Sequence, residues 1–142
     1  MVKTIAVTVL LTAVAVAGVS QQFWTGKKRA MISGMTERRL SQFEVLSTNH
    51  VAVVFVGDSI TEGGLWSEWL PDVDVINRGI SGNTTQDILD RMHQIVSVKP
   101  DKLFVMIGVN DLNKRLGVAV ALRNYTTLFD LIDAQLPLTE VF

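Results

Sequence analysis

A run of six apolar residues, followed at once by a glycine and two polar residues, constrains this chain more than any other feature. The run from Val51 to Val56 is too short for a free-standing helix. Its valine and phenylalanine content favours a strand buried on both faces, as in a parallel sheet. Gly57 permits a tight turn, and Asp58 and Ser59 then lie where a loop would leave the strand. Ligands of open α/β sheets bind at this end of the strands.

A simpler interpretation of the same residues is that they begin a helix. Ser59 and Glu62 fit the S-x-x-E capping box, in which the serine side chain bonds a backbone N–H group and the glutamate reaches back. Such boxes are common, so the local sequence leaves both interpretations open.

Length and composition fit one modest globular domain. The chain has 142 residues, of which 48% are hydrophobic, and its net charge of −1 gives no reason to expect a nucleic-acid partner. It contains no cysteine, which excludes disulfides and thiolate metal sites. His50 and His93 show no metal-ligand spacing, so no metal and no cofactor are expected.

Residues 1–20 are predicted to be a targeting segment. Lys3 precedes an uncharged run from Thr4 to Val19, and these sixteen residues would form a helix of about 24 Å, shorter than a hydrocarbon core of about 30 Å. This length favours a secretory signal peptide, and hence export to the periplasm or the extracellular space. An uncleaved membrane anchor that uses Phe23 and Trp24 at the interface is the alternative, with membrane association through residues 4–24.

Residues 21–49 are predicted to be a basic linker with a short amphipathic helix. The helix is expected from Thr36 to Leu46, where Leu40 and Phe43 recur at helical spacing. The basic run from Lys27 to Arg29 fits a solvated linker, and contact with anionic lipid is the alternative.

Short apolar runs alternate with helical patterns over residues 50–142, which we expect to form the folded domain. The predicted strands and helices are Val51–Val56, Val73–Ile76 and Leu103–Ile107, and Thr84–Val96 and Val118–Leu136, respectively. Strands that alternate with helices imply right-handed crossovers and a parallel sheet in an α/β fold. With three strands alone, the edge at Leu103–Ile107 would remain open.

Each predicted strand is followed by a loop rich in glycine and small polar residues. These loops are Gly57–Ser59, Asn77–Asn83 and Gly108–Asp111. The carboxyl ends of parallel strands point the same way, so the loops are expected to meet at one rim of the sheet. Turn formation explains their residue types. Together, however, they supply a hydroxyl, N–H groups beside glycines and a side-chain amide, which are the groups that acyl transfer needs.

The order of these loops resembles the GDSL esterase/lipase family, also called the SGNH hydrolases. The family motifs occur here as Gly57-Asp58-Ser59-Ile60-Thr61, Asn77-Arg78-Gly79-Ile80-Ser81-Gly82 and Gly108-Val109-Asn110-Asp111. Three motifs in order are a specific signal. The resemblance implies a three-layer α/β/α fold with a parallel sheet, the flavodoxin-like SGNH hydrolase fold, from which the carboxyl-terminal part is missing.

The resemblance also implies a role for each motif residue. Ser59 would attack an ester carbonyl to form an acyl-enzyme. Its N–H group, that of Gly82 and the side-chain amide of Asn110 would form the oxyanion hole. Asp58 and Asp111 would brace the loops by hydrogen bonds. The implied substrate is a small acyl ester, such as an acetylated sugar or a short-chain lipid.

The general base that the resemblance implies, in an Asp-x-x-His pair, does not occur after Asn110. His50 precedes the first predicted strand and His93 lies in a helix that returns to the opposite rim, so neither is expected to reach Ser59. The chain ends at Phe142, before the further β-α units of the family. We therefore expect a fragment or a truncated product with little activity of its own.

Two other functions stay open on the sequence. A non-catalytic binding or structural module would keep the fold and the rim without the missing base. Phosphate or nucleotide binding is a weaker hypothesis, because neither G-x-x-x-x-G-K-[ST] nor G-x-G-x-x-G occurs. Trp66 and Trp69 fit packing in the core better than they fit an acyl or sugar pocket.

Overall fold

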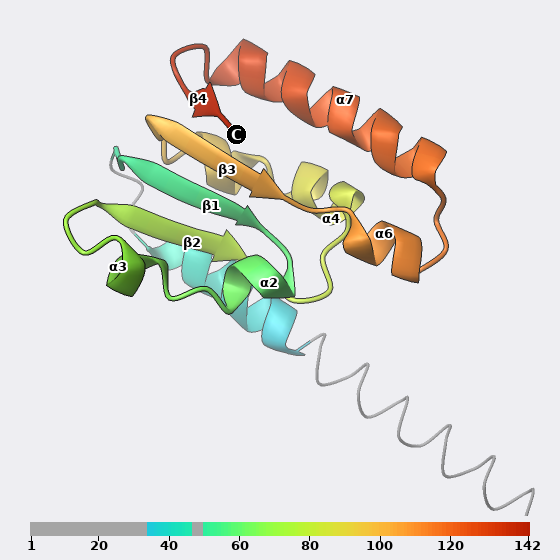
Figure 1. Ribbon diagram of the computed structural model, residues 1–142, viewed down its shortest axis with the longest axis horizontal. Coiled ribbons are helices and arrows are strands. Elements are labelled where there is room, and N and C mark those ends of the chain that lie inside the picture. Colours follow the sequence, from blue (N-terminus) through green and yellow to red (C-terminus); the bar gives the residue numbers. More distant parts are fainter. Residues whose placement is uncertain (1–33, 47–49) are drawn as a thin grey trace, which may run out of the picture. The chain divides into compact units, whose positions relative to one another are not determined.

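A computed structural model describes residues 34–46 and 50–142 of the protein (Figure 1). The chain divides into two compact units, Met1–Glu37 and Arg38–Phe142, and the sheet belongs to the second. The expected targeting segment and the basic run from Lys27 to Arg29 lie outside the described residues. Among the residues that are described, no helix has the length and apolar character needed to cross a bilayer.

The second unit is built on a parallel sheet of four strands in the order β2-β1-β3-β4 (Figure 1). The strands are β1 (Val53–Gly57), β2 (Val75–Gly79), β3 (Lys102–Met106) and β4 (Glu140–Val141). Strand β1 is central, with β2 on one side and β3 on the other. The α/β fold with a parallel sheet that the sequence predicts is therefore confirmed.

Helices connect the strands and cover both faces of the sheet. They are α2 (Ser59–Glu62), α3 (Trp66–Trp69), α4 (Thr85–Asp90), α5 (His93–Val96), α6 (Val109–Asn113) and α7 (Val118–Gln135). A further helix spans residues 34–45, of which residues 38–45 belong to the second unit. The helix predicted over Val118–Leu136 corresponds to α7. It ends one residue earlier than predicted, because the backbone of Leu136 leaves helical geometry.

The second strand lies later in the chain than the sequence predicts. The prediction covers Val73–Ile76, whereas β2 continues through Arg78 to Gly79, which pairs with Gly57 of β1. Pairing with the central strand holds these residues in extended conformation although they are not apolar. The loop that the sequence predicts from residue 77 therefore begins only after Gly79.

The open edge expected at Leu103–Ile107 is covered along part of its length, which corrects that expectation. Strand β4 pairs in parallel with the first two residues of β3. Just beyond this pairing, the Val105 N–H group donates to the Phe142 carbonyl at 3.0 Å. A strand of two residues gives no periodic signal, so the sequence pattern did not predict it.

The helix predicted over Thr84–Val96 is divided into α4 and α5. Its predicted start is confirmed, because Thr84 caps α4 and the Asp87 carboxylate accepts the Thr84 N–H group at 2.7 Å. At Arg91 the backbone leaves helical geometry, with φ −115° and ψ 20°. The Arg91 side chain there reaches Asn83, whose Oδ1 accepts from Nε at 2.9 Å.

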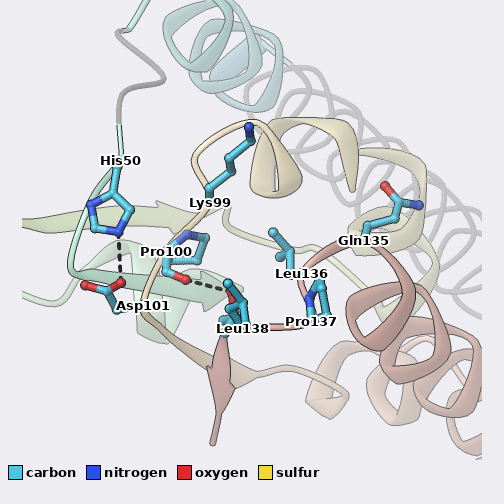
Figure 2. A pocket seen from close by; sticks show the side chains of 9 residues that line it. His50, Lys99, Pro100, Asp101, Gln135, Leu136, Pro137 and Leu138 are labelled. Atoms are coloured by element: carbon cyan, nitrogen blue, oxygen red, sulfur yellow. Dashed lines mark hydrogen bonds and ion pairs between the residues drawn. The ribbon is translucent and has the colours of Figure 1, made fainter.

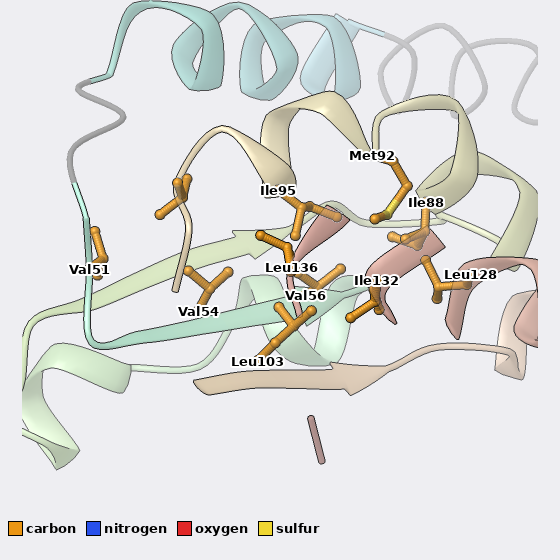
Figure 3. Packing of buried hydrophobic residues seen from close by; sticks show 11 residues of the cluster. Val51, Val54, Val56, Ile88, Met92, Ile95, Leu103, Leu128, Ile132 and Leu136 are labelled. Atoms are coloured by element: carbon orange, nitrogen blue, oxygen red, sulfur yellow. The ribbon is translucent and has the colours of Figure 1, made fainter. Parts of the chain in front are cut away.

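One face of the sheet carries the main hydrophobic core (Figure 3). Successive side chains of a strand point to opposite faces, and Val54, Val56 and Leu103 point to the face covered by α4, α5 and α7. The helix residues packed on them include Ile88, Ile95, Leu128 and Ile132. Each of these side chains contributes about 1.5–3 kcal/mol when fully buried, so this face fixes the strands that lead to the loops.

The other face carries a row of aromatic rings. The Phe55 ring stacks on Trp66 of α3 with centroids 3.9 Å apart, and on Phe104 at 4.8 Å. Phe142 continues the row, 4.6 Å from Phe104. The packing interpretation of Trp66 is thus supported, whereas Trp69 is 61% exposed.

The helix at residues 38–45 packs against the end of β2. Phe43 is 2% exposed, and the Arg78 guanidinium lies 4.5 Å from the centre of its ring. Arg39 donates from Nη2 to the Gly79 carbonyl at 3.2 Å. This helix, predicted to lie in the linker, is therefore part of the compact unit that begins at Arg38.

Candidate active site

Three loops meet at the carboxyl end of the sheet, and the side-chain amide of Asn110 joins them. Asn110 lies in α6, after β3, and donates from Nδ2 to the carbonyl of Asn83, after β2, at 2.9 Å. The same nitrogen lies 3.4 Å from Oδ2 of Asp58, after β1. A contact of 3.4 Å is long for a hydrogen bond. One amide hydrogen of Asn110 is therefore held weakly enough to turn to a better acceptor.

Asp58, and not Ser59, caps helix α2, so the alternative interpretation of Ser59 and Glu62 as a capping box is wrong. The buried Asp58 carboxylate accepts the Ile60 N–H group at 3.0 Å. Glu62, the other half of the expected box, points instead to Ser81 in the next loop, whose N–H group donates to its carboxylate at 2.7 Å. Asp58 competes successfully because its side chain is already placed one residue before the first helical turn.

The Ser59 hydroxyl is consequently not used in capping. Ser59 is the exposed first residue of α2, at the carboxyl end of the central strand. Within the part of the chain that the structure describes, no side chain forms a hydrogen bond with this hydroxyl. An exposed hydroxyl without a structural partner is accessible to a substrate.

Gly82 occupies a tight turn that only glycine adopts readily. The turn spans residues 80–83 and is closed by a hydrogen bond from the Asn83 N–H group to the Ile80 carbonyl at 3.2 Å. Gly82 has φ +81°, as the third residue of a type II turn requires. Lys114 donates from Nζ to the Gly82 carbonyl at 2.9 Å. The turn therefore fixes the direction of the Gly82 N–H group.

Gly79 lets helix α2 approach the end of β2. A Cβ atom at this position would lie 2.2 Å from the backbone nitrogen of Glu62, which no real side chain tolerates. The second motif thus contains one glycine for close packing and another, Gly82, for its backbone conformation.

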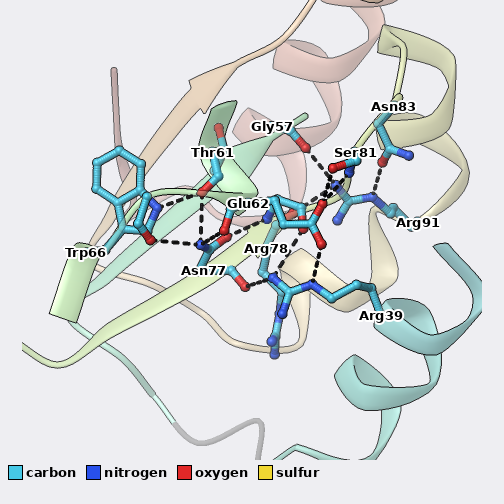
Figure 4. Close-up of polar contacts among 12 residues, drawn as sticks. Arg39, Gly57, Thr61, Glu62, Trp66, Asn77, Arg78, Ser81, Asn83 and Arg91 are labelled. Atoms are coloured by element: carbon cyan, nitrogen blue, oxygen red, sulfur yellow. Dashed lines mark hydrogen bonds and ion pairs between the residues drawn. The ribbon is translucent and has the colours of Figure 1, made fainter. Parts of the chain in front are cut away.

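Several residues that the sequence analysis did not select hold the loops in place (Figure 4). Arg91 is 4% exposed and donates from Nη2 to the Arg78 carbonyl at 2.9 Å and, more weakly, to the Gly57 carbonyl at 3.4 Å. Burial lowers the pKa of Arg91 to about 10, which still leaves it charged at neutral pH. A lone arginine within a helical pattern carries no local signal of such a role.

Tyr125 of α7 supports the third loop from the other side. Its hydroxyl donates to the Ile107 carbonyl at 2.5 Å, directly before the motif that contains Asn110. Burial raises the pKa of Tyr125, and the nearby carboxylates of Asp111 and Asp58 act in the same direction. The hydroxyl is therefore kept neutral and able to donate.

The two histidines lie away from the three loops. His50 Nε2 lies 2.8 Å from Oδ1 of Asp101, which directly precedes β3 and so marks the amino end of the sheet. The pair borders a cavity of about 290 Å³ at that end (Figure 2). His93 Nε2 lies 3.2 Å from Oε1 of Glu44. In residues 34–46 and 50–142, no three His, Cys, Asp or Glu side chains gather as metal ligands.

The fold and its rim of loops define a parallel α/β protein with three loops at the carboxyl end of its sheet, and comparison with known proteins gives its family. Residues 55–142 match the GDSL-like lipase/acylhydrolase family, and the chain belongs to this family. All three motifs quoted from the sequence fall within the matched range, so the resemblance found in the sequence is confirmed.

Two curated relatives and two solved structures illustrate the similarity. An acetylxylan esterase of Geobacillus stearothermophilus is 38% identical over 72 residues, 49% of this chain and 29% of the esterase. An uncharacterized lipoprotein of Bacillus subtilis, YqeF, is 34% identical over 76 residues, 42% of this chain and 31% of the lipoprotein. This chain thus spans about three tenths of these curated relatives.

The solved structures match over more of the chain. A candidate platelet activating factor from Streptococcus pneumonia has a TM-score of 0.73 and 27% identity, and the match covers 82% of this chain and 57% of that one. A GDSL-like lipase from Bacteroides thetaiotaomicron has a TM-score of 0.59 and 26% identity, with 75% and 55% covered. The chain therefore spans little more than half of either structure.

Proposed function

We propose that this chain carries the nucleophile and the oxyanion hole of a carboxylic ester hydrolase, with Ser59 as the nucleophile. The observation that best supports this assignment is the Asn110 amide, which lies 2.9 Å from the Asn83 carbonyl and 3.4 Å from the Asp58 carboxylate. Asn83 follows Gly82 in the chain, and Asp58 precedes Ser59. Ser59 and Gly82 are thus each one residue away from a contact with the Asn110 amide.

The proposed reaction is acyl transfer. The Ser59 hydroxyl oxygen attacks the ester carbonyl, and the negative charge that develops on the carbonyl oxygen is stabilised by three donors. These donors are the Ser59 and Gly82 N–H groups and the Asn110 amide. The alcohol leaves as the acyl-enzyme forms, and water later releases the acid. Asp58 and Asp111, both buried and hydrogen-bonded, hold the loops.

The proton of Ser59 must pass to a base during the attack. His50 and His93 are engaged by Asp101 and Glu44 away from Ser59, so neither of them serves. We therefore expect low activity from this chain alone, sustained by the oxyanion hole and substrate binding. An added base should raise that activity.

The proposed substrate is a small acyl ester. The acetylxylan esterase relative favours an acetylated sugar over a short-chain lipid. The lipoprotein relative supports the proposal that the protein is exported, with residues 1–20 as signal peptide or anchor.

A labelling experiment tests the nucleophile. The full chain is incubated with a fluorophosphonate in the presence and absence of imidazole, which replaces the missing base, and the modified residue is identified by peptide mass spectrometry. We expect modification of Ser59 that imidazole accelerates and that S59A abolishes. Removal of one oxyanion donor costs about 10²–10³ in rate, so N110A should slow labelling by that factor. N113A, in the same helix and exposed, is the matched control.

A non-catalytic binding module is the second candidate function. It is supported by the pairing of His50 with Asp101 and of His93 with Glu44, since a binding site needs no base. In that case Ser59 would stay unlabelled even with imidazole. Amide resonances of the three loops would nevertheless shift on titration with an acetylated xylo-oligosaccharide. Failure of Ser59 to label under both conditions contradicts the hydrolase assignment.

A further inference from the structure

Glu62 connects the helix of the nucleophile to the turn that contains Gly82. It is the last residue of α2, which begins at Ser59. Its Oε2 atom accepts both the N–H group and the hydroxyl of Ser81, the former at 2.7 Å (Figure 4). One carboxylate therefore holds two donors of the residue directly before Gly82.

These contacts fix the peptide unit between Ser81 and Gly82. The Glu62 carboxylate holds Ser81 on one side of this unit, and Lys114 holds the Gly82 carbonyl at 2.9 Å on the other. In a type II turn this central peptide points opposite to its direction in a type I turn, although both turns close the same hydrogen bond. Ser81 anchored in this way keeps the Gly82 N–H group in one of the two orientations.

Arg39 in turn holds Glu62. Its Nε lies 3.4 Å from Glu62 Oε1, and its Nη2 donates to the carbonyls of Gly79 at 3.2 Å and Asn77 at 3.4 Å. The side chains of Arg39 and Glu62 are 26% and 20% exposed. The pair is thus shielded from solvent more than a surface ion pair, which contributes about 0–1 kcal/mol. Arg39 also lies outside residues 55–142, the range matched to the family.

We infer that Glu62 is a positioning residue for the oxyanion hole and that Arg39, on the helix at residues 38–45, positions Glu62. This inference rests on the proposed function for its catalytic meaning. It adds to the residues that serve the oxyanion hole a helix that precedes the range matched to the family.

The experiment compares E62A, E62Q and R39Q in the full chain by two independent measurements. The first is the three-bond coupling between the amide and α protons of Gly82, which reports its φ angle. The second is labelling of Ser59 by a fluorophosphonate with imidazole present, separated into probe affinity and maximal rate. Matched controls are E68Q, an exposed carboxylate in the next helix, and R38Q, the exposed neighbour of Arg39.

We expect the Gly82 coupling of E62A to change toward the average of the type I and type II turns. A misplacement of about 1 Å can cost 10²-fold in rate, so the maximal labelling rate of E62A should fall by about that factor while probe affinity is kept. E62Q retains an acceptor for Ser81 and should recover most of the rate. The maximal labelling rate of R39Q should lie between those of E62A and the wild type, and both controls should label at the wild-type rate.

Two results would overturn the inference. One is a Gly82 coupling that is the same in E62A and the wild type. The other is a changed coupling with an unchanged labelling rate, because Glu62 would then shape the turn without affecting chemistry. If the wild type is never labelled, it is the proposed function that fails. The Gly82 coupling of E62A then decides by itself whether Glu62 fixes the turn.

Discussion

The carboxylate of Asp111 accepts two hydrogen bonds from Thr85, from the backbone N–H group at 2.9 Å and from the hydroxyl at 2.5 Å. Asp111 is fully buried and follows Asn110 in α6, whereas Thr85 is the first residue of α4. Asn124 of α7 completes the contact, donating from Nδ2 to the Thr85 hydroxyl oxygen at 2.9 Å. Three helices thus meet beneath the third loop.

We expect D111A to destabilise the protein substantially. The substitution leaves two buried donors of Thr85 without their acceptor, and a hydrogen bond to a charged group contributes about 1.5–3 kcal/mol. The free energy of unfolding, measured with a chemical denaturant, should fall by at least that amount. D130A, which changes an exposed aspartate on α7, is the control and should be nearly neutral. Equal stability of the two variants would contradict this account of Asp111.

Replacement of Gly82 by alanine should disturb the turn more than the core. An alanine at φ +81° costs about 1–2 kcal/mol, which favours rotation of the central peptide into a type I turn. We expect slower fluorophosphonate labelling of Ser59 and a modest loss of stability. G63A is the control, since Gly63 has φ −77° and space for a Cβ atom. A G82A variant that labels as fast as G63A would show that the Gly82 N–H group is not a donor.

The protonation of Tyr125 can be followed directly, because it is the single tyrosine of the chain. Burial raises the pKa of Tyr125 above its ordinary value of 10.0. Phenolate absorbance should therefore appear at higher pH in the folded protein than in denaturant. Because the unfolded chain loses this proton first, the contribution of Tyr125 to stability is complete below pH 10. It is lost as the pH rises through the folded-state pKa. Identical midpoints in both states would contradict the burial, and Y125F provides the blank.

The helix at residues 38–45 should be required for the stability of the unit. Phe43 is 2% exposed and packs against the guanidinium groups of Arg78 and Arg91, whose centres lie 4.5 and 6.0 Å from the ring. F43A should cost about 3–5 kcal/mol in the free energy of unfolding, as buried Phe-to-Ala substitutions do. L46A, at a position that is 54% exposed, is the control. If F43A were as stable as L46A, this helix would not be part of the folded unit.

Much of the fold followed from patterns along the chain. The apolar run before Gly57 and the alternation of strands with helices were enough to predict a parallel α/β sheet. What they missed depends on pairing and not on local preference. Strand β2 extends to Gly79 because it pairs with Gly57, and β4 is too short to give a pattern. The division of the helix at Arg91 likewise accompanies distant hydrogen bonds of its side chain.

The candidate site was predictable only as far as its motifs extend. The three loops could be brought to one rim because parallel strands share a direction. The contacts of Glu62 with Ser81 and Arg39 span 19 and 23 residues along the chain, so no local sequence pattern predicts them. The capping-box alternative at Ser59 stayed open for a local reason, since the pattern cannot tell which of two adjacent polar side chains will cap the helix.

The central place of β1 also determines which part of the molecule opens last. Both edges of β1 are hydrogen-bonded to neighbouring strands, whereas β4 is held by a two-residue pairing at the side of the sheet. Local unfolding begins where backbone bonds are few and exposed. Fraying can therefore release β4 while the strand before Ser59 keeps its amides protected from exchange.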